Sequence, residues 1–203
     1  RRHGLIRVRL PFLLPHVWFH HLHSRASQEF RETILSSVVK PREFWGEVLG
    51  RKDPRILNHP MMSREGWMDK AIPLSLHGES VPVIAVGGHA TKSLDCISWE
   101  SLFGTGGSIR TIKHLVFSIF EDSKATMEID GFDTMEEVWQ LSSWSFETLY
   151  EGEWHRADHT GRVYTLIDDP AEFELGGKLL ADGLFGVMRG IKGDLDYFAK
   201  GLK

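Results

Sequence analysis

The sequence predicts an α/β fold in which flanking helices cover a mixed sheet, preceded by a helical N-terminal region. Three observations predict this fold. Strand-like segments follow one another between residues 72 and 120, a long amphipathic pattern begins near residue 134, and apolar residues recur at helical spacing through much of residues 16–49. We therefore divide the chain into residues 1–70, a helical region with a connector, and residues 71–203, an α/β domain.

The composition is that of an ordinary globular protein. The chain has 203 residues, of which 41% are hydrophobic and 26% charged, and its formal net charge is -4. This length is sufficient for a hydrophobic core, and the charge gives no overall signal for nucleic acid or membrane surfaces. Cys96 is the single cysteine, which excludes an internal disulfide and a cysteine-rich zinc site within the chain.

The ends of the chain indicate a fragment of a larger intracellular protein. The apolar run at residues 10–19 is too short to span a membrane, is broken by two prolines, and lacks a clear signal cleavage site. The first residue is Arg1, and the last residues do not have the composition of a flexible terminal tail. We expect both ends to be cuts through a longer chain, and an exposed apolar patch or sheet edge near the C-terminus.

Prolines and glycines divide the N-terminal region. Pro11 and Pro15 interrupt any helix through them, and we expect a helix at residues 28–39 capped by Ser24 or Ser27. Pro41 would end this helix, and a short helix at residues 43–49 would stop at Gly50. Residues 51–70 are rich in turn residues and are expected to form the connector.

Four segments have the apolar patterns of strands. They are residues 72–76, 81–86, 93–98 and 114–120, and the last, being nearly all apolar, is expected to be central in the sheet. Between the first two, residues 77–80 have the composition of a turn, which carries Glu79.

The most clearly predicted helix covers residues 134–151. Asp133 or Thr134 is positioned to cap it, and Gly152 is positioned to end it. Helical spacing predicts one buried face, made of Met135, Val138, Trp139, Ser142, Phe146 and Leu149.

Two groups of residues are candidates for metal binding. His16 and His20 lie one helical turn apart in a cluster with His21 and His23, but no acidic or cysteine partner has a convincing spacing, so a partly exposed helix face is the favoured interpretation. Glu79 follows a predicted strand, and Asp194 and Asp196 follow a glycine-rich apolar segment. Without a family, these acids are expected to be solvated surface residues. Cys96 lies in an apolar strand and is expected to be an inert thiol.

Three segments carry a resemblance to known sequences. The segment IPLSLHGESVP at residues 72–82 resembles the pattern I-P-L-x-L-H-G-D-G-V-P of large repeat families in dinoflagellate genomes. The segments KSLDCISW at residues 92–99 and IKGDLDY at residues 191–197 look like the same families. More distantly, the layout resembles CACTA-type DDE transposases, which have an RNase H-like core.

The transposase resemblance implies a function and a site. It implies an incomplete RNase H-like domain in which Glu79 and Asp194 are catalytic and bind Mg²⁺ or Mn²⁺, with Asp196 as a further metal ligand. It also implies DNA as a partner and a nuclear location. Glu79 stands where the family pattern has aspartate, and no third catalytic acid follows Asp194 and Asp196 in this sequence, so we expect this chain to be inactive by itself.

Two other classes of function remain open. One is a domesticated, non-catalytic interaction module of unknown partner, which the seven tryptophans and the absent third acid favour. The other is an independent small enzyme, which is least favoured because no compact catalytic set is visible. Self-association is possible under each reading, and no membrane partner is expected.

Overall fold

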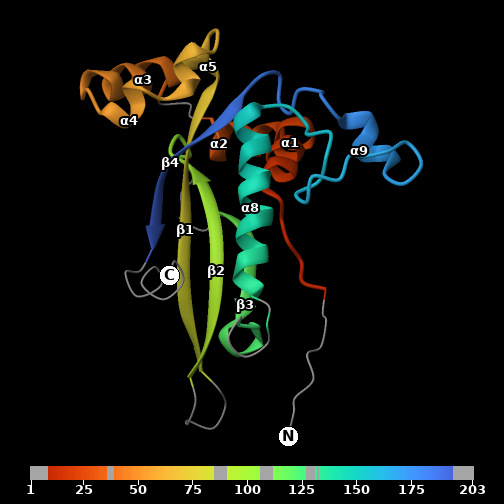
Figure 1. The fold of residues 1–203 in the computed structure, drawn as a ribbon. Coiled ribbons are helices and arrows are strands. Elements are labelled where there is room, and N and C mark those ends of the chain that lie inside the picture. Colours follow the sequence, from red (N-terminus) through yellow and green to blue (C-terminus); the bar gives the residue numbers. More distant parts are fainter. Residues whose placement is uncertain are drawn as a thin grey trace, which may run out of the picture.

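The computed structural model describes residues 9–35, 39–84, 91–105, 112–126, 131 and 133–193. Its four-stranded sheet has the order β3-β2-β1-β4 (Figure 1). The strands are β1 (Ala71–Ile84), β2 (Thr91–Ser101), β3 (His114–Phe120) and β4 (Phe185–Gly193). β2 pairs antiparallel with β1 and β3, whereas β4 runs parallel to β1. The predicted mixed sheet with flanking helices is therefore confirmed.

β1 is a single long strand, so the predicted turn at residues 77–80 is wrong. β1 pairs with β2 without a break from Leu74, opposite Ser101, to Ile84, opposite Thr91. Continuous pairing along one edge outweighs the local turn preference of the sequence around Gly78. The other predicted strands at residues 93–98 and 114–120 fall within β2 and β3. Residues 85 and 86 lie outside the described residues.

β3 lies at the edge of the sheet, not at its centre as its composition predicts. Val116, Phe117 and Ile119 are nevertheless buried, and the N-terminal segment covers part of this edge, whereas Leu115 and Phe120 are exposed. The Leu13 N–H donates a hydrogen bond of 2.9 Å to the Val116 carbonyl, and the Phe12 ring lies 5.9 Å from that of Phe117. A covered edge strand can therefore be as apolar as a central one.

Helix α8 (Thr134–Glu151) matches its prediction at both ends. The Asp133 carboxylate caps it by accepting from the Met135 and Glu136 N–H groups, and Gly152 ends it with a left-handed φ of 76°. The buried face is rotated slightly from the predicted one. Val138, Ser142, Ser145, Thr148 and Leu149 are buried, whereas Met135, Trp139 and Phe146 are half-buried at its side.

The N-terminal region is helical but divided differently from its prediction. Its helices are α1 (Pro15–Arg25), α2 (Ser27–Thr33), α3 (Pro41–Gly50), α4 (Pro54–Leu57), η1 (Pro60–Ser63) and α5 (Trp67–Lys70). Pro15 and Pro41 begin helices instead of breaking them, because the first helical turn needs no proline N–H. Neither Ser24 nor Ser27 caps α2, whose N-cap is Ala26. The expected connector contains three short helices.

Two hydrophobic clusters join the helices to the sheet. In the larger, Phe19 of α1 and Phe30 of α2 pack with Leu149 of α8 and with the sheet residues Leu74 and Trp99. In the smaller, α3, α4, η1 and α5 pack on the first residues of β1 and β4 through Trp45, Ile56, Met61, Trp67, Ala71, Phe185 and Val187. The N-terminal helices and the sheet thus share their cores. No helix of the described residues is long and apolar enough to cross a membrane.

α8 and β4 approach each other closely at Gly186. A Cβ atom at this position would lie 2.5 Å from Leu74 Cδ1 and 2.9 Å from Leu149 Cγ. These distances are shorter than ordinary van der Waals contact, so only glycine allows α8 to rest on the sheet at this point.

We predict that Gly186→Ala lowers the free energy of unfolding by about 1–3 kcal/mol, the usual effect of overpacking. Gly190→Ala in the same strand is the matched control, since a Cβ there meets nothing within 4 Å. Urea unfolding monitored by tryptophan fluorescence measures both. Equal stability of the two variants would contradict the close approach of α8 to β4.

Candidate functional site

One face of the sheet is polar where β1 pairs with β2. Leu74 and Leu76 point into the core beneath α8, so the alternate residues Ser75, His77 and Glu79 point to the opposite face. Their cross-strand partners on β2 are Glu100, Ser98 and Cys96. Directly opposite residues share a face of the sheet, so the polar side chains of both strands form one surface, here called the polar face.

Glu79 lies within β1 on this polar face, and not in a turn after a strand. Its carboxylate is half-exposed, and its Oε2 atom lies 3.3 Å from Nε2 of His77. Cys96 is its direct cross-strand neighbour. Burial raises the pKa of the Cys96 thiol, and the negative charges of Glu79 and Asp95 raise it further. This thiol is therefore protonated at neutral pH, as expected of an inert cysteine.

β4 brings a cation to the polar face. His77 lies opposite Lys192, and Gly78 lies opposite Gly193, the last described residue of β4. The Lys192 ammonium donates to Oε1 of the buried Glu100 at 2.8 Å, and the Ser75 hydroxyl donates to the same oxygen at 3.4 Å. Glu100 is thus a paired structural acid. Asp194 and Asp196, the other predicted site residues, lie outside the described residues.

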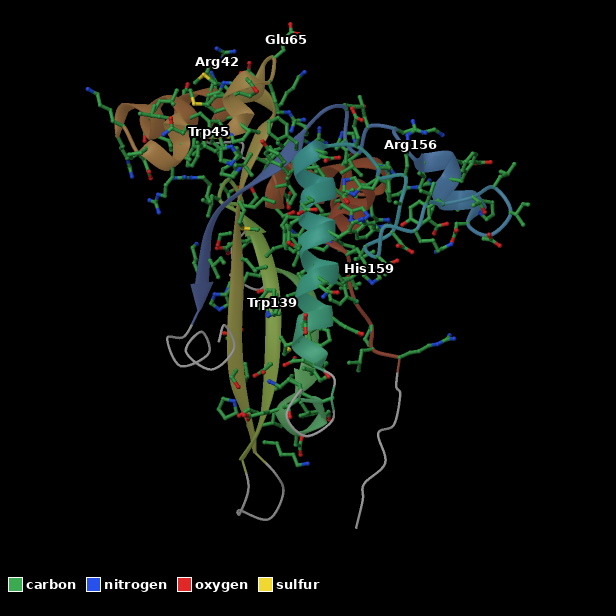
Figure 2. All side chains as sticks on the ribbon, viewed as in Figure 1. Arg42, Trp45, Glu65, Trp139, Arg156 and His159 are labelled. Carbon is green, nitrogen blue, oxygen red and sulfur yellow. The ribbon has the colours of Figure 1, made fainter. Side chains whose placement is uncertain are left out.

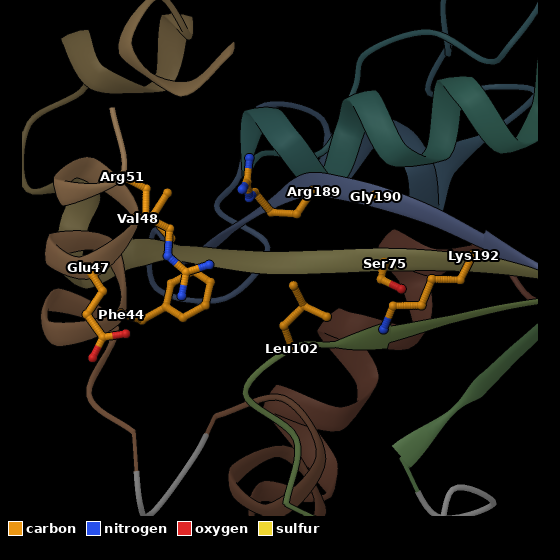
Figure 3. A pocket seen from close by; sticks show the side chains of 9 residues that line it. All are labelled: Phe44, Glu47, Val48, Arg51, Ser75, Leu102, Arg189, Gly190 and Lys192. Carbon is orange, nitrogen blue, oxygen red and sulfur yellow. The ribbon is translucent and has the colours of Figure 1, made fainter. Parts of the chain in front are cut away.

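A hollow of about 290 Å³ adjoins the polar face beneath α3 (Figure 3). Arg51 extends into it from the end of α3, and Lys192 enters from β4 (Figure 3). Its full lining is Phe44, Glu47, Val48, Arg51, Ser75, Leu102, Arg189, Gly190 and Lys192. Basic side chains outnumber acidic ones in this lining, so the hollow favours an anionic group over a cation.

The described residues contain no three His, Cys, Asp or Glu side chains placed to hold a metal ion together. His77 and Glu79 are a pair of possible ligands on one strand. A pair is fewer than the three or more protein ligands of typical zinc sites, although Mg²⁺ is often held by one or two carboxylates.

The N-terminal histidines have structural roles. Nδ1 of the buried His16 lies 2.8 Å from Oγ of Ser145 on α8, and Nδ1 of His20 lies 2.6 Å from the Leu180 carbonyl. The His21 ring stacks on Trp18, and the His23 ring packs on Phe30. Each histidine therefore packs or forms a hydrogen bond. The favoured interpretation, a partly exposed helix face, holds for His20, His21 and His23 and is wrong for His16, which is buried against α8.

The opposite face of the sheet has an apolar groove that sequence reasoning missed. The groove, of about 470 Å³, runs between α8 and the β4 edge, where Trp139 points toward the strands (Figure 2) and Phe146 is a further lining residue. The remaining lining residues are His59, Pro60, Leu74, Leu76, Ser143, Glu147, Tyr150, Gly186, Met188 and Ile191. A groove-lining residue and a core residue have the same helical spacing, so the periodicity of α8 does not separate them.

No protein-family model, curated protein or solved structure matches this chain.

We predict that the stability of the fold falls as the pH drops below about 6.5. Burial, and then the charges of His155 and His20, lower the pKa of His16 to about 3. The unfolded chain binds a proton near pH 6.5 whereas the folded chain does not, so acid favours unfolding through the whole interval down to about pH 3. At pH 5, His16 alone lowers the free energy of unfolding by about 2 kcal/mol relative to neutral pH. Burial also lowers the pKa of His114, to about 4, which adds to the loss.

Urea unfolding between pH 7 and pH 4.5 measures this dependence. His16→Gln removes one titrating group and should flatten the pH dependence, whatever its effect on stability at pH 7. His21→Gln, at an exposed position of the same helix, should retain the slope of the parent. A parent chain whose stability does not change over this interval would show that His16 is accessible to protons in the folded state.

Proposed function

We propose that this chain is part of a transposase-like protein with an RNase H-like domain, in which Glu79 and Asp194 bind Mg²⁺ or Mn²⁺. The order of the elements supports the proposal. An antiparallel meander of β1, β2 and β3 is followed by α8 and by a strand parallel to β1. RNase H-like domains begin with the same order. Of the acids named by the resemblance, Glu79 lies in the first strand, and Asp194 follows the fourth in the sequence.

The register of β1 and β4 is the observation that carries the proposed site. Gly193 lies opposite Gly78, Glu79 follows Gly78, and Asp194 follows Gly193 in the chain. If the register continues by one residue, the two carboxylates are neighbours on strands about 4.8 Å apart. Two carboxylates at that spacing repel each other without a cation and can share a divalent one.

The proposed site binds a metal ion but does not cleave DNA. Strand-transfer chemistry uses two metal ions to stabilise the attacking and leaving oxygens, and that arrangement needs a third catalytic acid in addition to Glu79 and Asp194. Glu79 also carries its carboxylate one bond further from the backbone than the aspartate of the family pattern. DNA as the partner, and with it a nuclear location, follows from the resemblance. Arg51 and Lys192 beside the polar face would favour phosphate contacts.

A second candidate function is a non-catalytic interaction module. The exposed apolar groove beside β4 favours it, since large exposed apolar surfaces mark sites of association. The two candidates differ in the role of Glu79, which matters for metal binding and is dispensable for an interaction through the groove.

We predict that Mg²⁺ or Mn²⁺, at 100 times its Kd, raises the melting temperature of the parent chain by about 5–11 °C. A ligand at 100 times its Kd stabilises by about 2.7 kcal/mol, and for a chain of this size each kcal/mol corresponds to about 2–4 °C. Glu79→Gln and Asp194→Asn should each remove most of this shift. Glu65→Gln, at the far end of the molecule where α5 lies (Figure 2), should retain it.

A parent chain with no metal-dependent shift would overturn the proposed site, as would an undiminished shift in both variants. A plasmid-nicking assay with the same proteins tests the expected lack of cleavage. Metal-dependent nicking that disappears in both variants would show that the acids of this chain suffice for catalysis.

A further inference from the structure

A β-bulge brings a further basic side chain to the hollow beneath α3. The register of β4 with β1 shifts between Met188 and Gly190, so Arg189 is the extra residue of the strand. A bulge re-aims a side chain, and bulges are frequent beside binding sites. Arg189 lines the hollow from β4, and Arg51 lines it from the end of α3 (Figure 3). Two guanidinium groups from different elements therefore line one cavity.

Neither of these guanidinium groups is committed to an acid. Among the described residues, none accepts a hydrogen bond from the side chain of Arg51 or Arg189 or forms an ion pair with it, although Nε of Arg189 is buried. The pKa of Asp53 is lowered mainly by hydrogen bonds from Arg55 and least by the charge of Arg189, so this acid is committed to Arg55. A buried charged donor without an acceptor is costly, and an anionic ligand would offset that cost.

The acids near the hollow do not pair with these two positive charges. The buried Glu100 is paired with Lys192 at 2.8 Å, so together these two residues add no net charge. Glu47 belongs to the lining, but its carboxylate points away from β1 and β4 (Figure 3). The Lys192 ammonium has three donors and uses one for Glu100, so it retains donors for a ligand. A ligand in the hollow would therefore meet two uncommitted guanidinium groups and one ammonium group.

A phosphate monoester matches this arrangement better than other common anions do. It carries a charge of about −1.5 to −2 at pH 7 and has three strong acceptor oxygens. Guanidinium groups bind such oxygens in bidentate fashion. A carboxylate carries one charge, as does each phosphate of a nucleic-acid backbone, and either would leave one of the two guanidinium groups uncompensated. The charge of the hollow therefore favours a monoester.

The apolar part of the lining fits the organic group of such an ester. Phe44, Val48 and Leu102 supply this part. The Phe44 ring is held edge-to-face by two others, with its centroid 5.1 Å from that of Trp45 and 5.2 Å from that of Phe103. The volume of about 290 Å³ is at the lower limit of small-molecule sites, which span roughly 300–1,000 Å³. The hollow is therefore suited to a small ester, and inorganic phosphate would leave its apolar wall without a contact.

We propose that the hollow beneath α3 binds a small organic phosphate monoester. Arg51 and Arg189 donate to the phosphate oxygens, and the organic group packs against Phe44. This binding does not depend on metal binding at Glu79. Duplex DNA, whose phosphates the same basic residues would attract, is the alternative occupant that the test must distinguish.

Isothermal titration calorimetry with phenyl phosphate, in a buffer without divalent cations, tests this proposal. One molecule should bind per chain. Arg51→Gln and Arg189→Gln should each weaken binding by about tenfold or more, because each removes a charged hydrogen-bond donor. Arg25→Gln is the matched control and should bind like the parent, since Arg25 is exposed at the end of α1, which packs beside α8. Arg51 is also exposed, so its replacement should leave folding intact, and thermal unfolding of each variant verifies this.

Three further ligands separate the possible occupants. Phenyl sulfate has nearly the shape of phenyl phosphate but a single charge, and inorganic phosphate has the charge without the ring, so each should bind about tenfold more weakly. A DNA duplex without terminal phosphates should not displace phenyl phosphate. The proposal is overturned if phenyl phosphate does not bind the parent, or if Arg51→Gln binds it as tightly as the parent does. Equally tight binding of phenyl sulfate or inorganic phosphate also overturns it, and displacement by the duplex assigns the hollow to the nucleic-acid backbone instead.

Discussion

The packing of α8 against β4 through Gly186 determines the rest of the architecture. Leu149 of α8 and Leu74 of β1 meet at the position where a larger residue would carry its Cβ. This contact holds β4 beside β1 and parallel to it, although 33 residues separate the end of α8 from the start of β4. The end of α8 is anchored at the same place, because the Arg64 guanidinium donates to the carbonyls of Tyr150 and Glu151. Such anchoring satisfies carbonyls that the last helical turn leaves unpaired.

The two faces of the resulting sheet have different chemistry. On one face, alternate residues of β1 and β2 place His77, Glu79 and Glu100 together with Lys192. On the other, α8 covers the sheet but stops short of the β4 edge, which leaves the apolar groove. A bulge between Met188 and Gly190 shifts the register of β4 so that Ile191 faces the groove and Lys192 the polar face. Metal binding on the polar face and association through the apolar groove, the two candidate functions, therefore both depend on β4 and its bulge.

Local signals in the sequence predicted part of this structure well. The α8 boundaries follow from Asp133 and Gly152, whose roles depend only on nearby backbone, and β3 was predicted at its observed residues. The turn predicted at residues 77–80 was wrong because pairing with β2 is a non-local interaction that local preferences do not contain. The edge position of β3 was missed for the same reason, since the cover from Phe12 and Leu13 comes from a distant segment.

The candidate site was predictable only in part. Motif resemblance selected Glu79, but its neighbours His77 and Cys96 could be identified only once the register of β1 and β2 was known. The close pairing of β4 with β1 is likewise a property of tertiary structure, because a glycine such as Gly186 reads in the sequence as a weak strand position. The apolar groove could not be predicted, because it depends on where α8 lies relative to β4. The hydrophobic periodicity of the sequence carries no information about that placement.

Nuclear Overhauser contacts in the isotope-labelled chain test the parallel pairing of β4 with β1 most directly. Parallel pairing predicts backbone contacts between Leu74 and Met188 and between His77 and Lys192, with Arg189 skipped at the bulge. Contacts that run in the antiparallel sense, or an absence of contacts between these two strands, would contradict it.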